Sequence, residues 1–126
     1  MYKISIIKRL IAQHYLLNEK GFESKIHSHP YKIEVILSGN KLDKNGYLVN
    51  FIEVERIIND IIELFRDKIL NKLEEFTESN PSLENFARIF CQKFISQIKA
   101  TNINSVVIRI WESEDVWALY QEDVQS

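Results

Sequence analysis

Two stretches in the first third of the chain alternate between apolar and polar residues, and they constrain the fold more than any other feature. Residues 2–8 are rich in β-branched side chains, and residues 31–38 alternate again. Side chains on a strand point to opposite faces in turn, so each stretch presents one apolar face. The first stretch can continue beyond residue 8 with Leu10, Ala12 and His14 on one face, and the second carries Tyr31, Ile33, Val35 and Leu37 on one face. A polar turn at residues 18–21 separates them, and together they predict a long antiparallel hairpin.

Two helices are expected after this hairpin. Asn50 has the pattern of a helix N-cap, with Glu53 three residues later as its capping partner. Apolar residues then recur at helical spacing at Ile57, Ile58, Ile61, Ile62, Phe65, Ile69 and Leu73. Residues 74–79 are polar and predict a loop. A second helix is expected to begin after Asn80, with Pro81 at its first position and an apolar face that includes several phenylalanines.

The end of the chain predicts a second hairpin. Residues 106–111 and 116–120 have the character of strands, and an acidic turn joins them. The order β-β-α-α-β-β groups strands and helices in runs rather than alternating them, which indicates the α+β class. A length of 126 residues corresponds to a single domain, so residues 1–126 are expected to fold as one unit.

Composition excludes several classes of protein. A formal charge of −2 argues against a general nucleic-acid binder. No stretch approaches the length of a transmembrane helix, and the first residues lack the apolar core of a signal peptide. Cys91 is the only cysteine, which excludes an intrachain disulfide and fits a cytoplasmic location. Its place within the second helix predicts a buried structural thiol rather than a nucleophile.

All three histidines of the chain, His14, His27 and His29, are candidate metal ligands. His27 and His29 are two residues apart before the second alternating stretch, so on a strand both imidazoles point to the same face. His14 on the neighbouring strand would complete a three-nitrogen site with an open fourth position, which is the catalytic form of a zinc site. Histidines on a surface or in a turn would show the same spacing, so the spacing alone leaves both interpretations open.

Six motifs, in order along the chain, carry a resemblance to a known family. They are Gln13-His14, residues 27–31, Asp43 through Gly46 to Asn50-Phe51, Leu70-Asn71, residues 80–85, and Trp111-Glu112-Ser113. In this order the chain resembles the 6-pyruvoyltetrahydropterin synthase and 6-carboxytetrahydropterin synthase family over nearly its whole length. The resemblance implies the tunnelling fold, a four-stranded antiparallel sheet with two helices on one face. It also implies that three subunits close a barrel and that two trimers form a homohexamer, which removes open strand edges.

The resemblance further implies where ligands bind. It places Zn²⁺ on the three histidines and the active site between subunits. Glu112 stands where the family has a glutamate that anchors the pterin ring, and a carboxylate there can accept two N–H hydrogen bonds. Ser82 stands in place of the family's threonine and keeps a hydroxyl for the substrate. Without the resemblance, Glu112 would be interpreted as an ordinary turn carboxylate.

Two departures from the family concern proton transfer. The queuosine-pathway branch has a cysteine base four residues before the first histidine of its His-x-His motif, and this chain has Glu23 there. A folate-pathway branch uses a glutamate one residue closer, where this chain has Ser24. Glu23 is therefore a candidate base, although a solvated loop glutamate is an equal alternative. The family's Asp-His pair aligns with Arg66-Asp67, which removes a histidine and leaves Asp67 as a weaker proton carrier.

These residues predict a zinc-dependent lyase of pterin metabolism, in tetrahydrobiopterin, queuosine or folate biosynthesis. Its substrate would be 7,8-dihydroneopterin triphosphate or a related dihydropterin, with Glu23 as base and Asp67 as secondary proton carrier. Because two proton-transfer groups are replaced, the activity is expected to be weak or altered. The alternatives are a non-catalytic pterin- or purine-binding protein and a metal-stabilised assembly module. Turnover of the substrate would distinguish the lyase from both alternatives. Stabilisation by a pterin would distinguish the binding protein from the assembly module.

Overall fold

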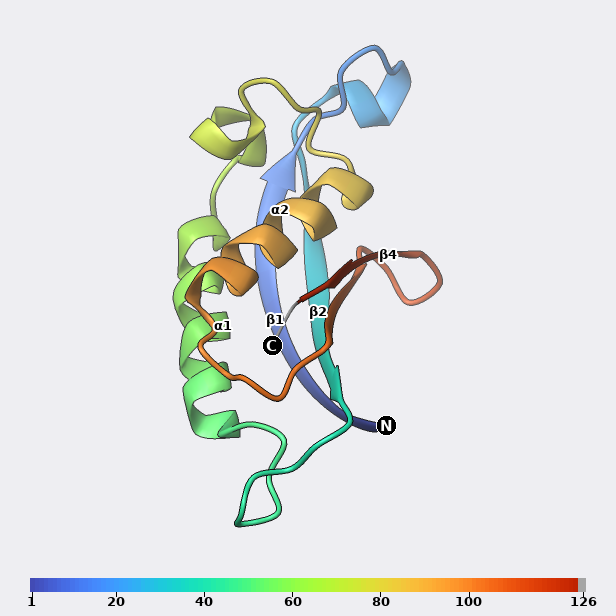
Figure 1. The fold of residues 1–126 in the computed structure, drawn as a ribbon. Helices are drawn as coiled ribbons and strands as arrows, with labels where there is room; N and C mark the ends of the chain where they lie inside the picture. Colours follow the sequence, from blue (N-terminus) through green and yellow to red (C-terminus); the bar gives the residue numbers. More distant parts are fainter. Residues whose placement is uncertain (125–126) are drawn as a thin grey trace.

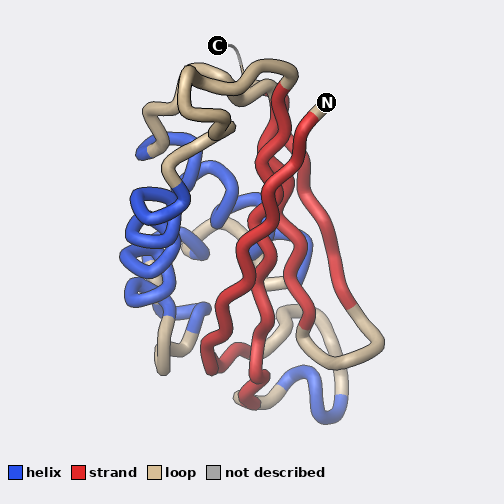
Figure 2. Tube along the Cα trace, turned by 90° about the horizontal axis from the view of Figure 1, so that it is seen from below, coloured by secondary structure: helices blue, strands red, loops and turns tan. Residues whose placement is uncertain are grey.

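Four antiparallel strands form one sheet in the computed structural model of the chain, which describes residues 1–124 (Figure 1). The strands lie across the sheet in the order β1 (Tyr2–His14), β2 (His27–Gly39), β3 (Ser105–Trp111) and β4 (Trp117–Asp123). Helices α1 (Phe51–Phe65) and α2 (Leu83–Gln97) cover one face of the sheet and leave the other uncovered (Figure 2). Single-turn helices η1 (Gly21–Ser24), η2 (Leu70–Lys72) and η3 (Glu74–Phe76) lie in the connections. The predicted α+β order is confirmed.

The predicted hairpin of β1 and β2 is confirmed. Its second strand spans His27–Gly39 and is longer than the alternating residues 31–38 indicated. The pairing runs from Tyr2 opposite Gly39 to His14 opposite His27. Its core face is made of the apolar residues that the alternation selected, and they are buried beneath the helices. β3 pairs with β2 only from Lys32 onward, so the histidine end of the hairpin extends beyond the rest of the sheet. That overhang leaves room for other segments to gather around the histidines.

Helix α1 begins as predicted. Asn50 is its N-cap, and the Asn50 side chain accepts a hydrogen bond from the N–H of Ile52 at 3.1 Å. Among the hydrogen bonds of residues 1–124, none joins Glu53 to Asn50, so half of the expected capping box is present. A single side-chain cap satisfies one of the N–H groups that a helix leaves unpaired at its start.

Helix α1 ends earlier than its apolar pattern predicted. The N–H of Arg66 makes the last helical hydrogen bond, and Asp67 then adopts a left-handed φ of 59°. The Asp67 N–H and the Lys68 carbonyl bond instead to the backbone of β1. Ile69 and Leu73 were wrongly predicted to lie on this helix. The edge of β1 offers backbone partners to this segment, and Ile69 pairs with β1 in a parallel bridge.

Helix α2 begins two residues later than predicted, at Leu83 instead of Pro81. Ser82 is the N-cap, and its hydroxyl accepts a hydrogen bond from the N–H of Asn85 at 3.2 Å. The prediction of Pro81 at the first helical position was wrong, because the Asn80 side chain, which would cap such a helix, instead accepts a hydrogen bond from the N–H of Leu17 at 2.9 Å. The segment expected to be a loop, residues 74–79, contains the single turn η3. Within residues 1–124, no helix combines the length and the apolar character needed to cross a membrane.

An aromatic cluster joins the helices to the sheet beneath the histidines. The ring of Phe86 lies 5.2 Å from the ring of Tyr31 on β2 and 5.2 Å from the ring of Phe65 at the end of α1, between ring centroids. All three side chains are fully buried. Edge-to-face aromatic pairs of this kind stabilise a core beyond the area that they bury.

Truncation of Phe86 should therefore destabilise the fold strongly. We expect Phe86→Ala to lower the free energy of unfolding by about 3–5 kcal/mol, from lost burial and a residual cavity. Denaturant titration at one fixed protein concentration measures it. Phe51→Ala is the matched control, because Phe51 is 52% exposed. This substitution should lower the free energy of unfolding by at least about 2 kcal/mol less than Phe86→Ala does. Equal losses in the two variants would contradict this account of the core.

Candidate metal centre and substrate pocket

The three histidines lie together at the overhanging end of the β1–β2 hairpin. His14 is directly opposite His27, and His29 is opposite Ala12, so all three imidazoles face the helices. One nitrogen from each ring lies within 4.8 Å of the others. Ring centroids are 4.5–5.0 Å apart, and His14 and His27 are buried while His29 is partly exposed. The hairpin register thus assembles the predicted triad.

The donor atoms of these rings fit a metal ion. The Nε2 atoms of all three are buried and have no hydrogen-bond partner within the described residues. The Nδ1 atoms of His14 and His27 lie 2.8 Å and 2.7 Å from the carbonyls of Pro81 and Lys25. Since a carbonyl only accepts, each Nδ1 carries the proton and leaves a lone pair on Nε2. This is the outer-shell arrangement found around metal-binding histidines.

Burial favours the neutral form of two of these rings, His14 and His29. It lowers the pKa of His14, and the neighbouring His27 and His29 lower it further, although the Pro81 carbonyl opposes them. Burial also lowers the pKa of His29, against the attraction of Glu112. A lowered pKa favours the uncharged imidazole at neutral pH, and only that form binds a metal.

Two carboxylates reach the histidines from different parts of the chain. An oxygen of Glu23, on η1, lies 3.6 Å from Nε2 of His27. An oxygen of Glu112, in the turn after β3, lies 3.8 Å from Nε2 of His29. The Glu23 side chain is 47% exposed and the Glu112 side chain is 29% exposed, so both border solvent. The structure therefore brings both predicted carboxylates to the metal centre.

A cavity of about 400 Å³ adjoins the metal centre. Its walls come from His14, from Ser82 and Glu84 at the start of α2, and from Glu112 and Trp117 of the β3–β4 hairpin. The Ser82 hydroxyl already accepts the capping hydrogen bond of α2 and still borders this cavity. The residues that border the cavity beside the histidine triad thus include two carboxylates, Glu84 and Glu112, and the hydroxyl-bearing Ser82.

Asp67 is not part of this cluster within one chain. It is exposed in the connection after α1, and its N–H donates to the Ile11 carbonyl at 2.7 Å. Among the described residues, no hydrogen bond or ion pair joins Asp67 to the histidines. A role for Asp67 in this site would require a second subunit.

Two groups at the metal centre were not found from the sequence. The Pro81 carbonyl orients His14, but a backbone atom leaves no signal in residue identity. The Tyr31 hydroxyl lies 3.3 Å from Nδ1 of His14, and burial raises the pKa of Tyr31 well above its usual value. Tyr31 follows His29 by two residues on the same strand face, which was the available signal. As expected, Cys91 is buried, and burial raises its pKa to about 12, so its thiol is structural.

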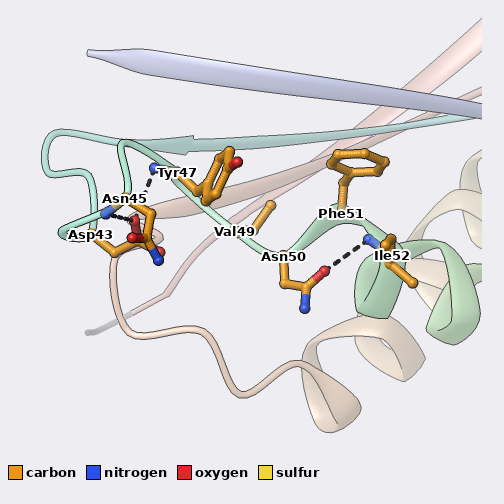
Figure 3. A pocket seen from close by; sticks show the side chains of 7 residues that line it. All are labelled: Asp43, Asn45, Tyr47, Val49, Asn50, Phe51 and Ile52. Carbon is orange, nitrogen blue, oxygen red and sulfur yellow. Dashed lines mark hydrogen bonds between the residues drawn. The ribbon is translucent and has the colours of Figure 1, made fainter.

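A second cavity, of about 350 Å³, lies at the other end of the molecule, beside the start of α1 (Figure 3). Two of its polar side chains, Asp43 and Asn50, are already engaged in local structure. The Asp43 carboxylate accepts hydrogen bonds from the N–H groups of Asn45 and Tyr47, which closes the predicted turn. Asn50 caps α1. The carboxylates that lie beside the histidines, Glu23 and Glu112, are at the opposite end of the molecule.

Comparisons with known proteins agree with this geometry. The sequence profile of the 6-pyruvoyl tetrahydropterin synthase family matches residues 3–123. An Archaeoglobus fulgidus protein assigned as a 6-carboxy-5,6,7,8-tetrahydropterin synthase is 33% identical over 94 residues, which are 75% of this chain and 74% of that protein.

Solved structures share the fold. The 6-pyruvoyl tetrahydropterin synthase of Caenorhabditis elegans superposes with a TM-score of 0.81 at 18% identity, covering 96% of this chain and 95% of that one. The Plasmodium vivax synthase superposes with a TM-score of 0.77 at 14% identity, covering 98% and 100%. That structure is described as a catalytic residue mutant, with alanine in place of a glutamate. From the matched profile and the Archaeoglobus relative, the chain belongs to the 6-pyruvoyl tetrahydropterin synthase family.

Proposed function

We propose that this protein is a zinc-dependent lyase that acts on 7,8-dihydroneopterin triphosphate or a related dihydropterin. The observation that carries the proposal is the set of three buried Nε2 atoms, each without a partner, beside the carboxylates of Glu23 and Glu112. Buried polar atoms without partners are costly, and a metal ion would satisfy all three. A cytoplasmic location is part of the proposal, and the single buried Cys91 supports it.

Zinc suits this donor set because it accepts three imidazole nitrogens and keeps a fourth position open for substrate. When bound, it would polarise the side-chain oxygens of the substrate and so favour loss of protons from the adjacent carbons. His14 and His27 would be held in their binding tautomer by the carbonyls of Pro81 and Lys25.

Glu112 and Ser82 are the proposed substrate-binding residues. A pterin in the 400 Å³ cavity could present its amino-pyrimidine edge to the Glu112 carboxylate, which has two acceptor oxygens. Because Glu112 also lies 3.8 Å from His29, a ring anchored there would direct its side chain toward the metal centre. Ser82 would donate its hydroxyl proton to the substrate while its oxygen caps α2.

Glu23 is the proposed base. Its carboxylate lies beside His27 and half-exposed at the mouth of the site, where a side-chain proton of the substrate would come within reach. A glutamate is also the catalytic residue replaced in the Plasmodium vivax relative. Asp67, in place of the family's histidine, would serve as a secondary proton carrier only if a neighbouring subunit presents it.

We also propose that the protein assembles as a homo-oligomer of trimers, with the hexamer as its final form. β1 and β4 are open edges of the sheet, and the uncovered face exposes apolar side chains on both strands, including Ile7, Ile11 and Leu119. Pairing of β1 with β4 of another copy would close both edges. It would also place the Asp67 connection, which lies on the β1 edge, beside another chain.

A non-catalytic pterin- or purine-binding protein is the second candidate. The observation that favours it is the position of Asp67, which is exposed and lies away from the triad, where the resemblance leads us to expect a histidine of the family. Such a protein would be stabilised by a pterin without converting it.

Metal loading tests the first step of the proposal. After zinc loading and dialysis, elemental analysis should give one zinc per chain. His27→Gln removes a ligand, so it should weaken zinc affinity by more than the ~10–100-fold that follows from loss of a residue hydrogen-bonded to a ligand. Ser28→Gln is the matched control, because Ser28 is exposed on the opposite face of the same strand and should keep full binding. Substoichiometric zinc in the parent protein would refute the metal site.

Two pairs of variants test the carboxylates, with products from dihydroneopterin triphosphate followed by mass spectrometry. Glu23→Gln should lower kcat by ~10²–10⁴-fold and leave pterin affinity nearly unchanged, because a base acts in the reaction step. Glu112→Gln should instead weaken pterin binding by ~10–100-fold, the cost of one charged hydrogen-bonding partner.

The controls for this test are Glu19→Gln and Glu114→Gln. Both residues are exposed glutamates in the same two connections, so both variants should behave like the parent protein. Unchanged turnover in Glu23→Gln would make Glu23 a bystander. A pterin that stabilises the zinc-loaded protein and is never converted would favour the non-catalytic alternative.

Native mass spectrometry tests the assembly. We expect a hexamer at micromolar concentration, because β4 and the part of β1 before Ile11 can gain outer-edge backbone partners from other copies. Ile11→Lys on the uncovered face of β1 should dissociate it, whereas Leu64→Lys, on the exposed side of α1, should not. A monomer mass for the parent protein would exclude this proposal.

A further inference from the structure

Residues 15–26 form a connection that leaves β1 after His14 and returns to β2 at His27. It therefore begins and ends at a histidine of the metal centre, and it carries Glu23 on η1. Figure 1 shows it as a protruding loop at the end of the hairpin. A carboxylate on such a loop keeps a fixed distance from His27 only if other parts of the molecule anchor the loop.

Asn71 on η2 provides an anchor with two hydrogen bonds. Its Oδ1 accepts from the N–H of Tyr15 at 2.9 Å, and its Nδ2 donates to the carbonyl of Tyr15 at 2.8 Å. The amide thus pairs with Tyr15 as a neighbouring strand would, at the residue that directly follows His14. The preceding residue, Leu70, is fully buried, so η2 is itself fixed in the core.

The anchor at Tyr15 continues to Glu23 through one residue. The N–H of Leu16 donates to the carbonyl of Glu23 at 2.7 Å, across the neck of the loop. The N–H of Leu17 donates to the Asn80 side chain at 2.9 Å, which adds a second attachment. The path thus runs from the side-chain amide of Asn71 to the backbone of Tyr15, and from the backbone N–H of Leu16 to the carbonyl of Glu23. Each step is a hydrogen bond or a peptide link.

We propose that Asn71 is a positioning residue that holds Glu23 in place beside His27 and so sets the rate of proton transfer without touching the substrate. The inference rests on the proposed function, since it concerns the base of that reaction. It assigns a role to the Leu70-Asn71 motif, which otherwise only marked the resemblance.

The chemistry requires an amide at this position. Tyr15 presents one donor and one acceptor, and asparagine matches both. Aspartate has the same shape but only accepts, so Asn71→Asp would place a carboxylate oxygen against the Tyr15 carbonyl with no proton between them. That substitution removes one hydrogen bond and introduces a repulsion at the start of the loop.

The test compares Asn71→Asp with the parent protein as zinc-loaded assemblies. We expect kcat for the dihydropterin reaction to fall ~10–100-fold, with KM within about threefold and zinc stoichiometry unchanged. Amide hydrogen exchange at Tyr15 and Leu16 should accelerate. Asn59→Asp, the same change on the exposed face of α1, is the control and should match the parent in every measurement.

A double variant shows whether Asn71 acts through Glu23. In the Glu23→Gln background, Asn71→Asp should cause little further loss of kcat, because the group that it positions is already gone. Multiplied losses, or a fall in zinc binding with kcat per bound zinc unchanged, would overturn the proposal. An inactive parent protein would overturn the proposed function, whereas an active Asn71→Asp variant would overturn only the role of Asn71.

The parent protein also tests the anchor directly, which matters if Asn71→Asp fails to fold. In native-state hydrogen exchange, the amides of Tyr15 and Leu16 should be protected and should open together, as one unit. Exchange of the Tyr15 amide at the rate of a free loop would refute the anchor.

Discussion

The antiparallel pairing of β1 with β2 is the interaction on which the site depends. It places His14 directly across from His27, and His29 on the next position of the same face. A slip of one residue in this register would turn His14 to the uncovered face and dismantle the triad. The register is specified by burial, because Leu10 and Ala12 on β1 and the apolar residues of β2 must face the helices together.

The histidine triad is continuous with the core. Tyr31 lies between the His14 ring and the buried ring of Phe86, so a packed column of side chains supports the histidines from beneath. Burial has a cost, since it leaves three Nε2 atoms without partners and lowers the pKa of His14 and His29. A site of this kind is preorganised for a cation: burial favours the neutral form of His14 and His29, and the carbonyls of Pro81 and Lys25 orient His14 and His27 before a ligand arrives.

Around this rigid centre, the carboxylates proposed to take part in the reaction lie on connections. Glu23 belongs to the loop between β1 and β2, and Glu112 to the turn after β3. Asp67 belongs to the connection that follows α1 along the open edge of β1. Loops that a scaffold anchors can change their chemistry without altering the fold. The chain thus keeps the family's fold with these carboxylates placed on its connections.

The amino-acid sequence by itself predicted the elements and named three histidines as candidate metal ligands, because strand alternation and helical spacing are local patterns. It placed His27 and His29 on one face and named His14 as their partner. It misplaced the end of α1 and the start of α2, where Ile69 and Pro81 have partners that are distant in the chain. Only the tertiary structure showed the Pro81 carbonyl on His14, the Tyr31 hydroxyl beside it and the Asn71 amide on Tyr15. These contacts join backbone or side-chain atoms of segments brought together by packing, and no residue spacing encodes them.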